Sequence, residues 1–213
     1  MIWCLGDLVG YGPRPNRCCS LVAERADLCL VGNHDLVVLG DLSLEDFNEE
    51  AAAAARWTRE VLDAEARAYL ESLEPSAEAN GVELYHASPR DPVWEYVLDG
   101  FAIQAAFDES SASIVLVGHS HVPIRASLMD GRLTGEHAPE RTEVGLSEGR
   151  FLLNPGAVGQ PRDGDPRAAW LLLDLGEKQA SFRRVEYPLE RTQEEMRERG
   201  LPETLAARLG HGV

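Results

Sequence analysis

The stretch Ile114-Val115-Leu116-Val117-Gly118-His119-Ser120-His121 joins four apolar residues to a glycine and two histidines. A short apolar run of this kind is typical of a strand that is buried on both faces. Three further runs also end in residues that can bind a metal ion: residues 2–6 before Asp7, 28–32 before Asn33 and His34, and 82–85 before His86. Because ligands collect beyond the carboxyl ends of the strands in open α/β sheets, the pattern predicts an α/β fold with these residues at one edge.

The composition suits one ordinary globular domain that spans residues 1–213, with 44% hydrophobic and 26% charged residues. No apolar run approaches the roughly 20 residues that a membrane-spanning helix needs. The four cysteines, Cys4, Cys18, Cys19 and Cys29, lie near the amino end and two of them are adjacent, which is a poor disulfide framework. We therefore expect a cytoplasmic protein with reduced thiols and no membrane partner.

The formal net charge of −16 argues against a nucleic acid polymer as partner. The basic residues form no local cluster apart from the pair Arg183 and Arg184, so nothing in the sequence would neutralise a run of phosphates. The sequence leaves the oligomeric state open.

The first two thirds of the chain alternate strands and helices, whereas the last third favours antiparallel hairpins. We expect helices over residues 16–25, 49–62, 63–73, 101–107, 191–199 and 202–209. The expected strands of the last third are residues 124–129, 132–136, 151–153, 168–175 and 180–187. An Asp130-Gly131 turn and a tight reversal over residues 176–179 connect two pairs of these strands.

The metal-ligand atoms that these residues offer at the strand ends favour a borderline divalent transition ion. Asp7 offers an anionic oxygen, Asn33 a neutral oxygen, and His86 and His119 imidazole nitrogens, a mixture that suits manganese, iron, zinc or nickel. Calcium would need more oxygen ligands. Each of these residues taken alone is more often a structural hydrogen-bonding group, so the prediction rests on their combination.

Five motifs in order resemble those of the calcineurin-like metallophosphoesterases, in particular their small bacterial branch. They are GDLVGYGP at 6–13, GNHD at 32–35, YHASPRD at 85–91, GHSH at 118–121 and NPGAVGQPRDGD at 154–165. The resemblance runs from Gly6 to about residue 175 and implies a double β-sheet sandwich flanked by helices. It also implies two divalent metal ions that activate a water for attack on a phosphoryl group.

The resemblance assigns a role to each matching residue. Asp7 matches the carboxylate that bridges the two metal ions, and His121 matches a ligand of the first ion. The remaining ligands of the second ion are matched by Asn33, His86 and His119. His34 matches a histidine that does not bind metal but stabilises or protonates the leaving oxygen.

The chain departs from the family pattern at its start. The family begins with a strand that ends in an Asp-x-His motif and supplies two ligands of the first ion, and residues 2–6 already correspond to the second strand of that pattern. We expect either a truncated sequence or a natural shortened form. Because Asp7 and His121 alone remain for the first ion, the sequence predicts weak occupancy of that site and an impaired or inactive chain.

A second departure concerns the orientation of His34. Many family members carry an aspartate three residues after the bridging one, where this chain has Gly10. Asp35 could take part of that role by orienting the ring of His34 through a hydrogen bond. The alternative is that Asp35 caps the helix that follows.

The segment from Asn154 to Arg162 follows an apolar strand and is rich in glycine and proline. We nominate Asn154 and Arg162 for contact with substrate, because an arginine presents a planar pair of donors to a phosphate oxygen. The alternative is a turn in which Arg162 pairs with Asp163 or Asp165 in solvent.

Three functions remain open. The favoured one is hydrolysis of a small phosphomonoester or phosphodiester by a dinuclear metal-dependent enzyme. The second is a non-catalytic interaction module with an impaired metal centre, as described for a retromer subunit of this fold. The third, a protein serine/threonine phosphatase, ranks lowest, because the acidic chain would repel phosphorylated peptides away from the metal ions.

Overall fold

The computed structural model describes residues 1–213 and divides into two compact units. The first unit comprises Met1–Pro75 and Pro188–His211, and the second comprises Ser76–Tyr187 and Gly212–Val213. The division does not test the prediction of one domain over residues 1–213, which stays a prediction. None of the helices is long and apolar enough to cross a lipid bilayer.

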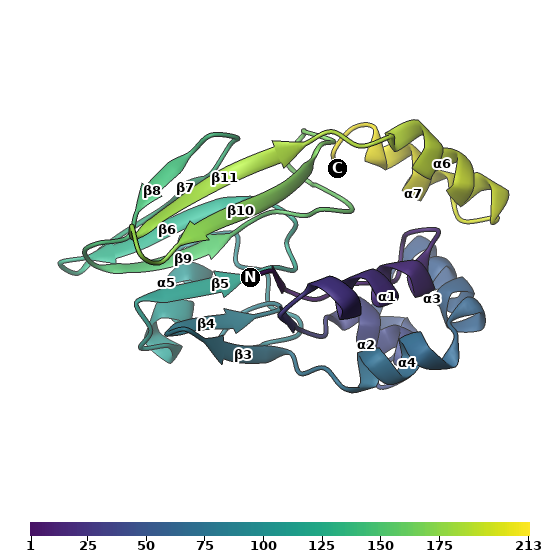
Figure 1. Ribbon diagram of the computed structural model, residues 1–213, viewed down its shortest axis with the longest axis horizontal. Helices are drawn as coiled ribbons and strands as arrows, with labels where there is room; N and C mark the ends of the chain where they lie inside the picture. The colour runs from purple at the N-terminus through teal and green to yellow at the C-terminus, as the bar shows by residue number, and fades with distance from the viewer. The chain divides into compact units, whose positions relative to one another are not determined.

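The first unit combines a two-stranded parallel sheet with helices, and Figure 1 labels its α-helices. The sheet pairs β1 (Trp3–Cys4) with β2 (Leu28–Cys29). The helical elements are α1 (Pro15–Arg25), α2 (Asn33–Leu39), the 3-10 helix η1 (Leu44–Asp46), α3 (Glu49–Val61), α4 (Ala64–Glu71), α6 (Leu189–Glu198) and α7 (Glu203–Leu209). Both strands are shorter than the apolar runs that predicted them.

The alanine-rich helix α3 contributes to both apolar cores of the first unit. Ala55 joins Val37 of α2 and Leu70 of α4 in one core. Ala54, the next residue along the chain, joins Met196 and other buried side chains of α6 and α7 in the other. Small side chains on α3 allow neighbouring helices to approach it closely, which explains the run of alanines at its start.

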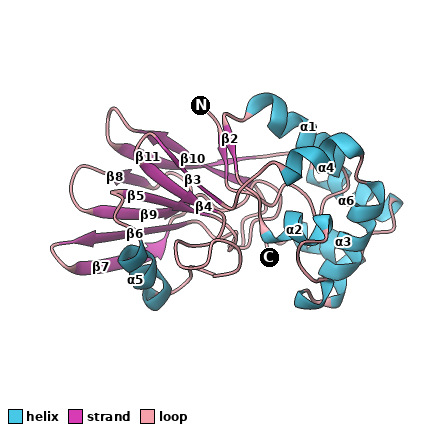
Figure 2. Ribbon diagram, turned by 90° about the horizontal axis from the view of Figure 1, so that it is seen from below, coloured by secondary structure: helices cyan, strands magenta, loops and turns pink.

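The helices of the first unit, drawn in cyan in Figure 2, confirm the helices that were predicted for its residues. Two of them begin at a capping side chain. The side chain of Asn48 accepts a hydrogen bond from the amide of Ala51 at the start of α3, and Asp63 does the same for Ala66 in α4. Helix α2 was not predicted as an element, because its first residues belong to the GNHD motif.

The second unit contains two sheets, which confirms the predicted double-sheet architecture. The strands of the six-stranded sheet, in spatial order, are β3 (Ser76–Ala79), β4 (Val82–Tyr85), β5 (Ile114–Val117), β9 (Arg150–Asn154), β6 (Ile124–Met129) and β7 (Arg132–His137). The three-stranded sheet contains β10 (Ala168–Asp174), β11 (Gln179–Val185) and β8 (Glu143–Gly145). Glu136 of the first sheet and Val144 of the second line one cavity of about 360 Å³.

The hairpins of the second unit are the predicted ones, with β6 paired to β7 and β10 paired to β11. Strand β9 differs from the expectation of antiparallel hairpins, since it runs parallel to β5 and antiparallel to β6. The two mixed neighbours place β9 in the interior of the sheet, which explains why most of its residues are buried. Strands β3 and β8 were not predicted, because neither has an apolar run.

Helix α5 (Gly100–Glu109) covers one face of the six-stranded sheet. Its residues Ile103 and Phe107 pack with Val115 and Val117 of β5 in a buried cluster. Strands β4 and β5 are parallel, so His86 and His119, which follow them, emerge at the same edge of this sheet.

Candidate metal centre

In the first unit, Asp7 follows β1 and has a left-handed backbone conformation, with φ of 57°. Its side-chain Oδ1 accepts a hydrogen bond from the amide of His34, 2.9 Å away. Gly32 makes this approach possible, since a Cβ atom there would lie 2.1 Å from Asp7 Oδ1. Asn33, the first residue of α2, is buried in the same unit. The first unit thus brings together Asp7 and the GNHD motif.

Asp35 is fully buried, and its carboxylate binds backbone amides in the two chain segments that carry Asp7 and Asn33. Its carboxylate accepts hydrogen bonds from the amides of Asp7 at 2.9 Å, Val9 at 3.1 Å and Gly32 at 2.9 Å. Burial, and after it the nearby carboxylate of Asp7, raises the pKa of Asp35 well above its ordinary value. These contacts match the helix-capping interpretation of Asp35, and its orientation of His34 stays a prediction.

The imidazole of His34 is buried between two aromatic rings, those of Tyr11 and Phe47, each with its centroid 4.4 Å away. Gly10, where many family members were expected to carry an aspartate, lies against this imidazole. A Cβ atom at Gly10 would lie 2.6 Å from His34 Nδ1. The departure at Gly10 therefore lets the loop pack directly on the histidine.

In the second unit, the rings of His86 and His119 are 5.2 Å apart between centroids. Nε2 of His119 lies 3.1 Å from the carbonyl oxygen of Trp94. A carbonyl oxygen only accepts hydrogen bonds, so this nitrogen carries the proton and Nδ1 keeps the lone pair that a metal ion needs. The ring of Tyr96 stacks on that of His119, with the two centroids 4.1 Å apart. Both contacts fix the orientation of His119.

His121 shows the opposite tautomer. Its Nδ1 lies 2.8 Å from the carbonyl oxygen of Gln160, so Nδ1 donates and Nε2 keeps its lone pair. The amide of Arg162 donates to the carbonyl of His121 at 3.2 Å, which holds the loop of the NPGAVGQPRDGD motif against the GHSH motif. The guanidinium of Arg162 donates to Gln160 Oε1. Both sequence interpretations of Arg162, contact with substrate and pairing with Asp163 or Asp165, stay predictions, and the structure adds Gln160 as a partner.

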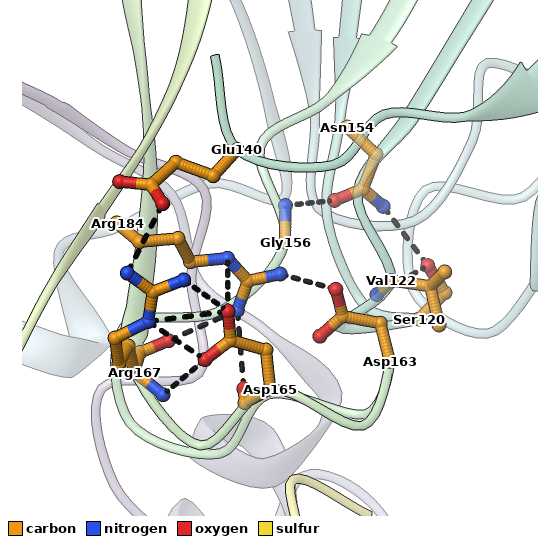
Figure 3. Close-up of polar contacts among 9 residues, drawn as sticks. All are labelled: Ser120, Val122, Glu140, Asn154, Gly156, Asp163, Asp165, Arg167 and Arg184. Atoms are coloured by element: carbon orange, nitrogen blue, oxygen red, sulfur yellow. Dashed lines mark hydrogen bonds and ion pairs between the residues drawn. The ribbon is translucent and has the colours of Figure 1, made fainter. Parts of the chain in front are cut away.

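Asn154 connects the same two motifs from inside the unit. It is fully buried, and its Nδ2 donates to the carbonyl of Gly118 at 2.7 Å. The same nitrogen donates to Ser120 Oγ at 2.9 Å (Figure 3). Its Oδ1 accepts a hydrogen bond from the amide of Gly156 at 2.9 Å. These contacts give Asn154 a structural role in the loop, and its contact with substrate stays a prediction.

The loop between β9 and β10 is anchored by a buried arginine. The side chain of Arg184 is only 3% exposed and forms an ion pair with Asp163 (Figure 3). It also donates to the backbone carbonyls of Asp165 at 3.2 Å and Arg167 at 2.9 Å. Arg167 in turn pairs with Asp165 and Glu140. The acidic residues of the NPGAVGQPRDGD motif thus pair with arginines of the following strand and loop.

Three candidate ligands share an uncommon backbone conformation. Seven residues other than glycine have positive φ, and three of these, Asn80, Asp130 and Lys178, lie in turns between paired antiparallel strands. Three others are Asp7, His119 and His121, with φ of 57°, 57° and 61°. Such strain costs on the order of 1–3 kcal/mol per residue and clusters at functional sites.

Several contacts of this site were not found by sequence reasoning. Trp94 and Gln160 act through backbone carbonyls, which any residue type would supply, so no sequence signal marks them. Tyr96 is an exposed aromatic residue that had no periodic pattern around it. Arg184 was noted only as half of a basic pair, because the sequence gives no sign of its burial.

The fold and these residues define a class of mixed α/β protein with metal-type ligands after the strands of both units. Asp7 in the first unit, and His86 and His119 in the second, are residues of types that can bind a metal ion. Residues 1–178 match the family described as the calcineurin-like phosphoesterase superfamily domain.

Relatives of known sequence or structure agree with that match. An uncharacterized protein of Methanocaldococcus jannaschii is 37% identical over 214 residues, which cover 98% of this chain and 85% of that protein. The crystal structure of a metallophosphoesterase from Sphaerobacter thermophilus is 41% identical, with a TM-score of 0.91 over 100% of this chain and 88% of that one. A hypothetical protein from Pyrococcus horikoshii OT3 is 19% identical, covers 99% of this chain and 84% of its own, and shares the fold with a TM-score of 0.77.

The chain therefore belongs to the calcineurin-like phosphoesterase superfamily, whose members generally hydrolyse phosphoesters with divalent metal ions. The resemblance found in the sequence is confirmed.

Proposed function

We propose that this protein is a metal-dependent hydrolase of a small phosphomonoester or phosphodiester. Its ligands are Asp7, Asn33, His86 and His119 for one divalent transition ion, and Asp7 with His121 for a second. The net charge of −16 favours a small phosphorylated substrate over a polynucleotide, which would be repelled over its whole length. The proposed compartment is the cytoplasm, in keeping with four free cysteines.

The observation that carries the proposal is the strained backbone at Asp7, His119 and His121. Left-handed φ occurs in only a few per cent of residues other than glycine, among which aspartate and histidine adopt it most readily, and it persists where the surroundings impose it. Each of the two histidines also donates a hydrogen bond from one ring nitrogen to a backbone carbonyl. The other ring nitrogen is then the one that can bind a metal ion. Neutral, oriented imidazoles and a carboxylate fit a divalent transition ion.

The other residues take roles beside the metal ions. Bound ions supply a nucleophilic water at neutral pH and offset charge on the phosphoryl oxygens. His34, held between Tyr11 and Phe47, protonates the leaving oxygen. Arg162 donates to a phosphoryl oxygen of the substrate, and Asn154 keeps its loop against the GHSH motif. Asp35 fixes the backbone that carries Asp7.

A hydrolysis assay tests the proposal. The chain, loaded with Mn²⁺, is given a chromogenic phosphomonoester and a chromogenic phosphodiester, beside the variants His34→Ala, Asp7→Ala and His211→Ala. His211 is exposed and serves as the control. We expect His34→Ala to lower turnover while metal content is nearly intact, whereas Asp7→Ala loses both.

Two results would count against the proposal. Full metal content in Asp7→Ala would contradict the role of Asp7 as a ligand. No hydrolysis of either ester by a fully loaded chain would favour the alternative of a non-catalytic interaction module.

A further inference from the structure

Two of the four cysteines lie opposite each other in the small sheet of the first unit. Cys4 in β1 and Cys29 in β2 are register partners on neighbouring parallel strands, and both are free thiols. Neighbouring strands lie about 4.8 Å apart, which is within the range of Cα separations, roughly 4.4–6.8 Å, that a disulfide bridges. Register partners point to the same face of a sheet, so the two side chains meet.

The two thiols are in contact. The neighbouring thiol of Cys29 lowers the pKa of Cys4, whereas the neighbouring thiol of Cys4 raises the pKa of Cys29. The Sγ of Cys29 donates to the carbonyl oxygen of Leu30, 3.4 Å away, and Cys4 is the thiol of the pair that carries negative charge more readily. The thiolate is the reactive form of cysteine, which makes Cys4 the nucleophile of the pair.

The pair differs from the other two cysteines. Cys4 and Cys29 are both half-buried, so a small reagent can reach them. Cys19 is buried, and its burial raises the pKa of the thiol to about 12. Cys18 is exposed, but its thiol also has a raised pKa, because neighbouring atoms desolvate it. Neither Cys18 nor Cys19 has the contact with a second thiol that favours a thiolate.

We propose that Cys4 and Cys29 form a modification site, a dithiol that a low-molecular-weight disulfide oxidises to an intramolecular disulfide. The Cys4 thiolate attacks one sulfur of the small disulfide, and the first small thiol leaves as the S–S bond breaks. The Cys29 sulfur then attacks the Cys4 sulfur, releases the second small thiol and gives up its proton. Two protein thiols are oxidised by two electrons, and one small disulfide is reduced to two thiols.

The disulfide would join the two strands that lead to the candidate ligands of the first unit. β1 ends three residues before Asp7, and β2 ends four residues before Asn33. A covalent bond there fixes the separation of the two chain segments that carry Asp7 and Asn33, which hydrogen bonds, including those of Asp35, hold in the reduced chain.

The sequence makes a direct test possible, because trypsin separates the cysteines. Cleavage after Arg17, Arg25 and Arg56 places Cys4 in peptide 1–17, Cys18 and Cys19 in peptide 18–25, and Cys29 in peptide 26–56. The folded chain is incubated with oxidised glutathione, its remaining thiols are alkylated, and the digest is analysed by mass spectrometry without reduction. We expect a linked pair of peptides 1–17 and 26–56, with peptide 18–25 alkylated at both cysteines.

Two variants complete the test. In Cys18→Ser, the matched control, the same linked pair forms. In Cys29→Ser, the reaction stops at a mixed disulfide of glutathione with Cys4, provided that circular dichroism shows the native fold. The proposal is overturned if Cys4 is recovered alkylated after incubation of the unmodified chain, or if it is linked to peptide 18–25.

Discussion

The two units hold their candidate ligands by opposite means. In the first unit, Asp7 follows a strand of two residues, and the loop depends on a buried anion, Asp35, which accepts three backbone amides. In the second unit, His86 and His119 follow central strands of a six-stranded sheet. The loop beside His121 depends on a buried cation, Arg184, which donates to two backbone carbonyls and pairs with Asp163.

A buried charge can thus replace secondary structure in a loop that carries candidate metal ligands. A buried carboxylate accepts hydrogen bonds from backbone amides, and a buried guanidinium donates them to backbone carbonyls. Either group therefore satisfies backbone groups that a sheet would otherwise pair. Asp35 accepts a hydrogen bond from the amide of Asp7. In the second unit, Asp163, the partner of Arg184, follows Arg162, whose amide donates to the carbonyl of His121. Changes at the anchors therefore test whether each loop depends on its buried charge.

The largest effect is expected for Arg184→Gln. The change leaves Asp163 without its ion-pair partner and two carbonyls without donors, and removing one member of a buried pair costs about 3 kcal/mol. Urea unfolding measures the loss. The matched control is Arg183→Gln, because Arg183 is the adjacent residue and its pair with Glu143 is exposed. Equal stability of the two variants would show that the loop does not depend on Arg184.

A smaller loss is expected for Asp35→Asn in the first unit. The amide group that replaces one carboxylate oxygen cannot accept a hydrogen bond, so at least one of the amides of Asp7, Val9 and Gly32 is left unpaired, at about 2 kcal/mol. The exposed residue Asp41 provides the control, Asp41→Asn. If the Asp35→Asn chain unfolds at the same urea concentration as the control, the loop that carries Asp7 does not depend on the carboxylate of Asp35.

The smallest effect on stability is expected for Gly10→Ala. Gly10 has φ of 122° and lies against His34, so the added Cβ costs about 1 kcal/mol and displaces the imidazole. We expect turnover of the chromogenic ester to fall clearly, while the free energy of unfolding changes only by that amount. Gly12→Ala is the control, because a Cβ at Gly12 meets no atom within 4 Å. Unchanged turnover in Gly10→Ala would mean that the position of His34 does not matter.

Much of the fold could be predicted from the sequence, because capping residues and turn residues act locally. Asn48 and Asp63 mark the starts of α3 and α4, and Asp130 with Gly131 marks the turn between β6 and β7. Strands β3 and β8 escaped prediction because they have no apolar pattern, and they are strands because neighbouring strands pair with them.

The identities of the candidate ligands could also be read from the sequence, since aspartate, asparagine and histidine have distinctive chemistry. The contacts that hold these residues in place could not be read from the sequence. The carbonyl oxygens of Trp94 and Gln160 are backbone groups without a sequence signature. Arg184 and Asp163 are separated by 20 residues of chain, so only the folded strands bring them together.

The central proposal is that Asp7 and His119 bind the same ion. The most direct measurement is Mn²⁺ content after equilibrium dialysis, by elemental mass spectrometry, for the unmodified chain, Asp7→Ala, His119→Ala and the double variant. If one ion is shared, each single variant loses it and the double variant loses no more than either. Losses that add in the double variant, or full Mn²⁺ content in either single variant, would contradict the claim.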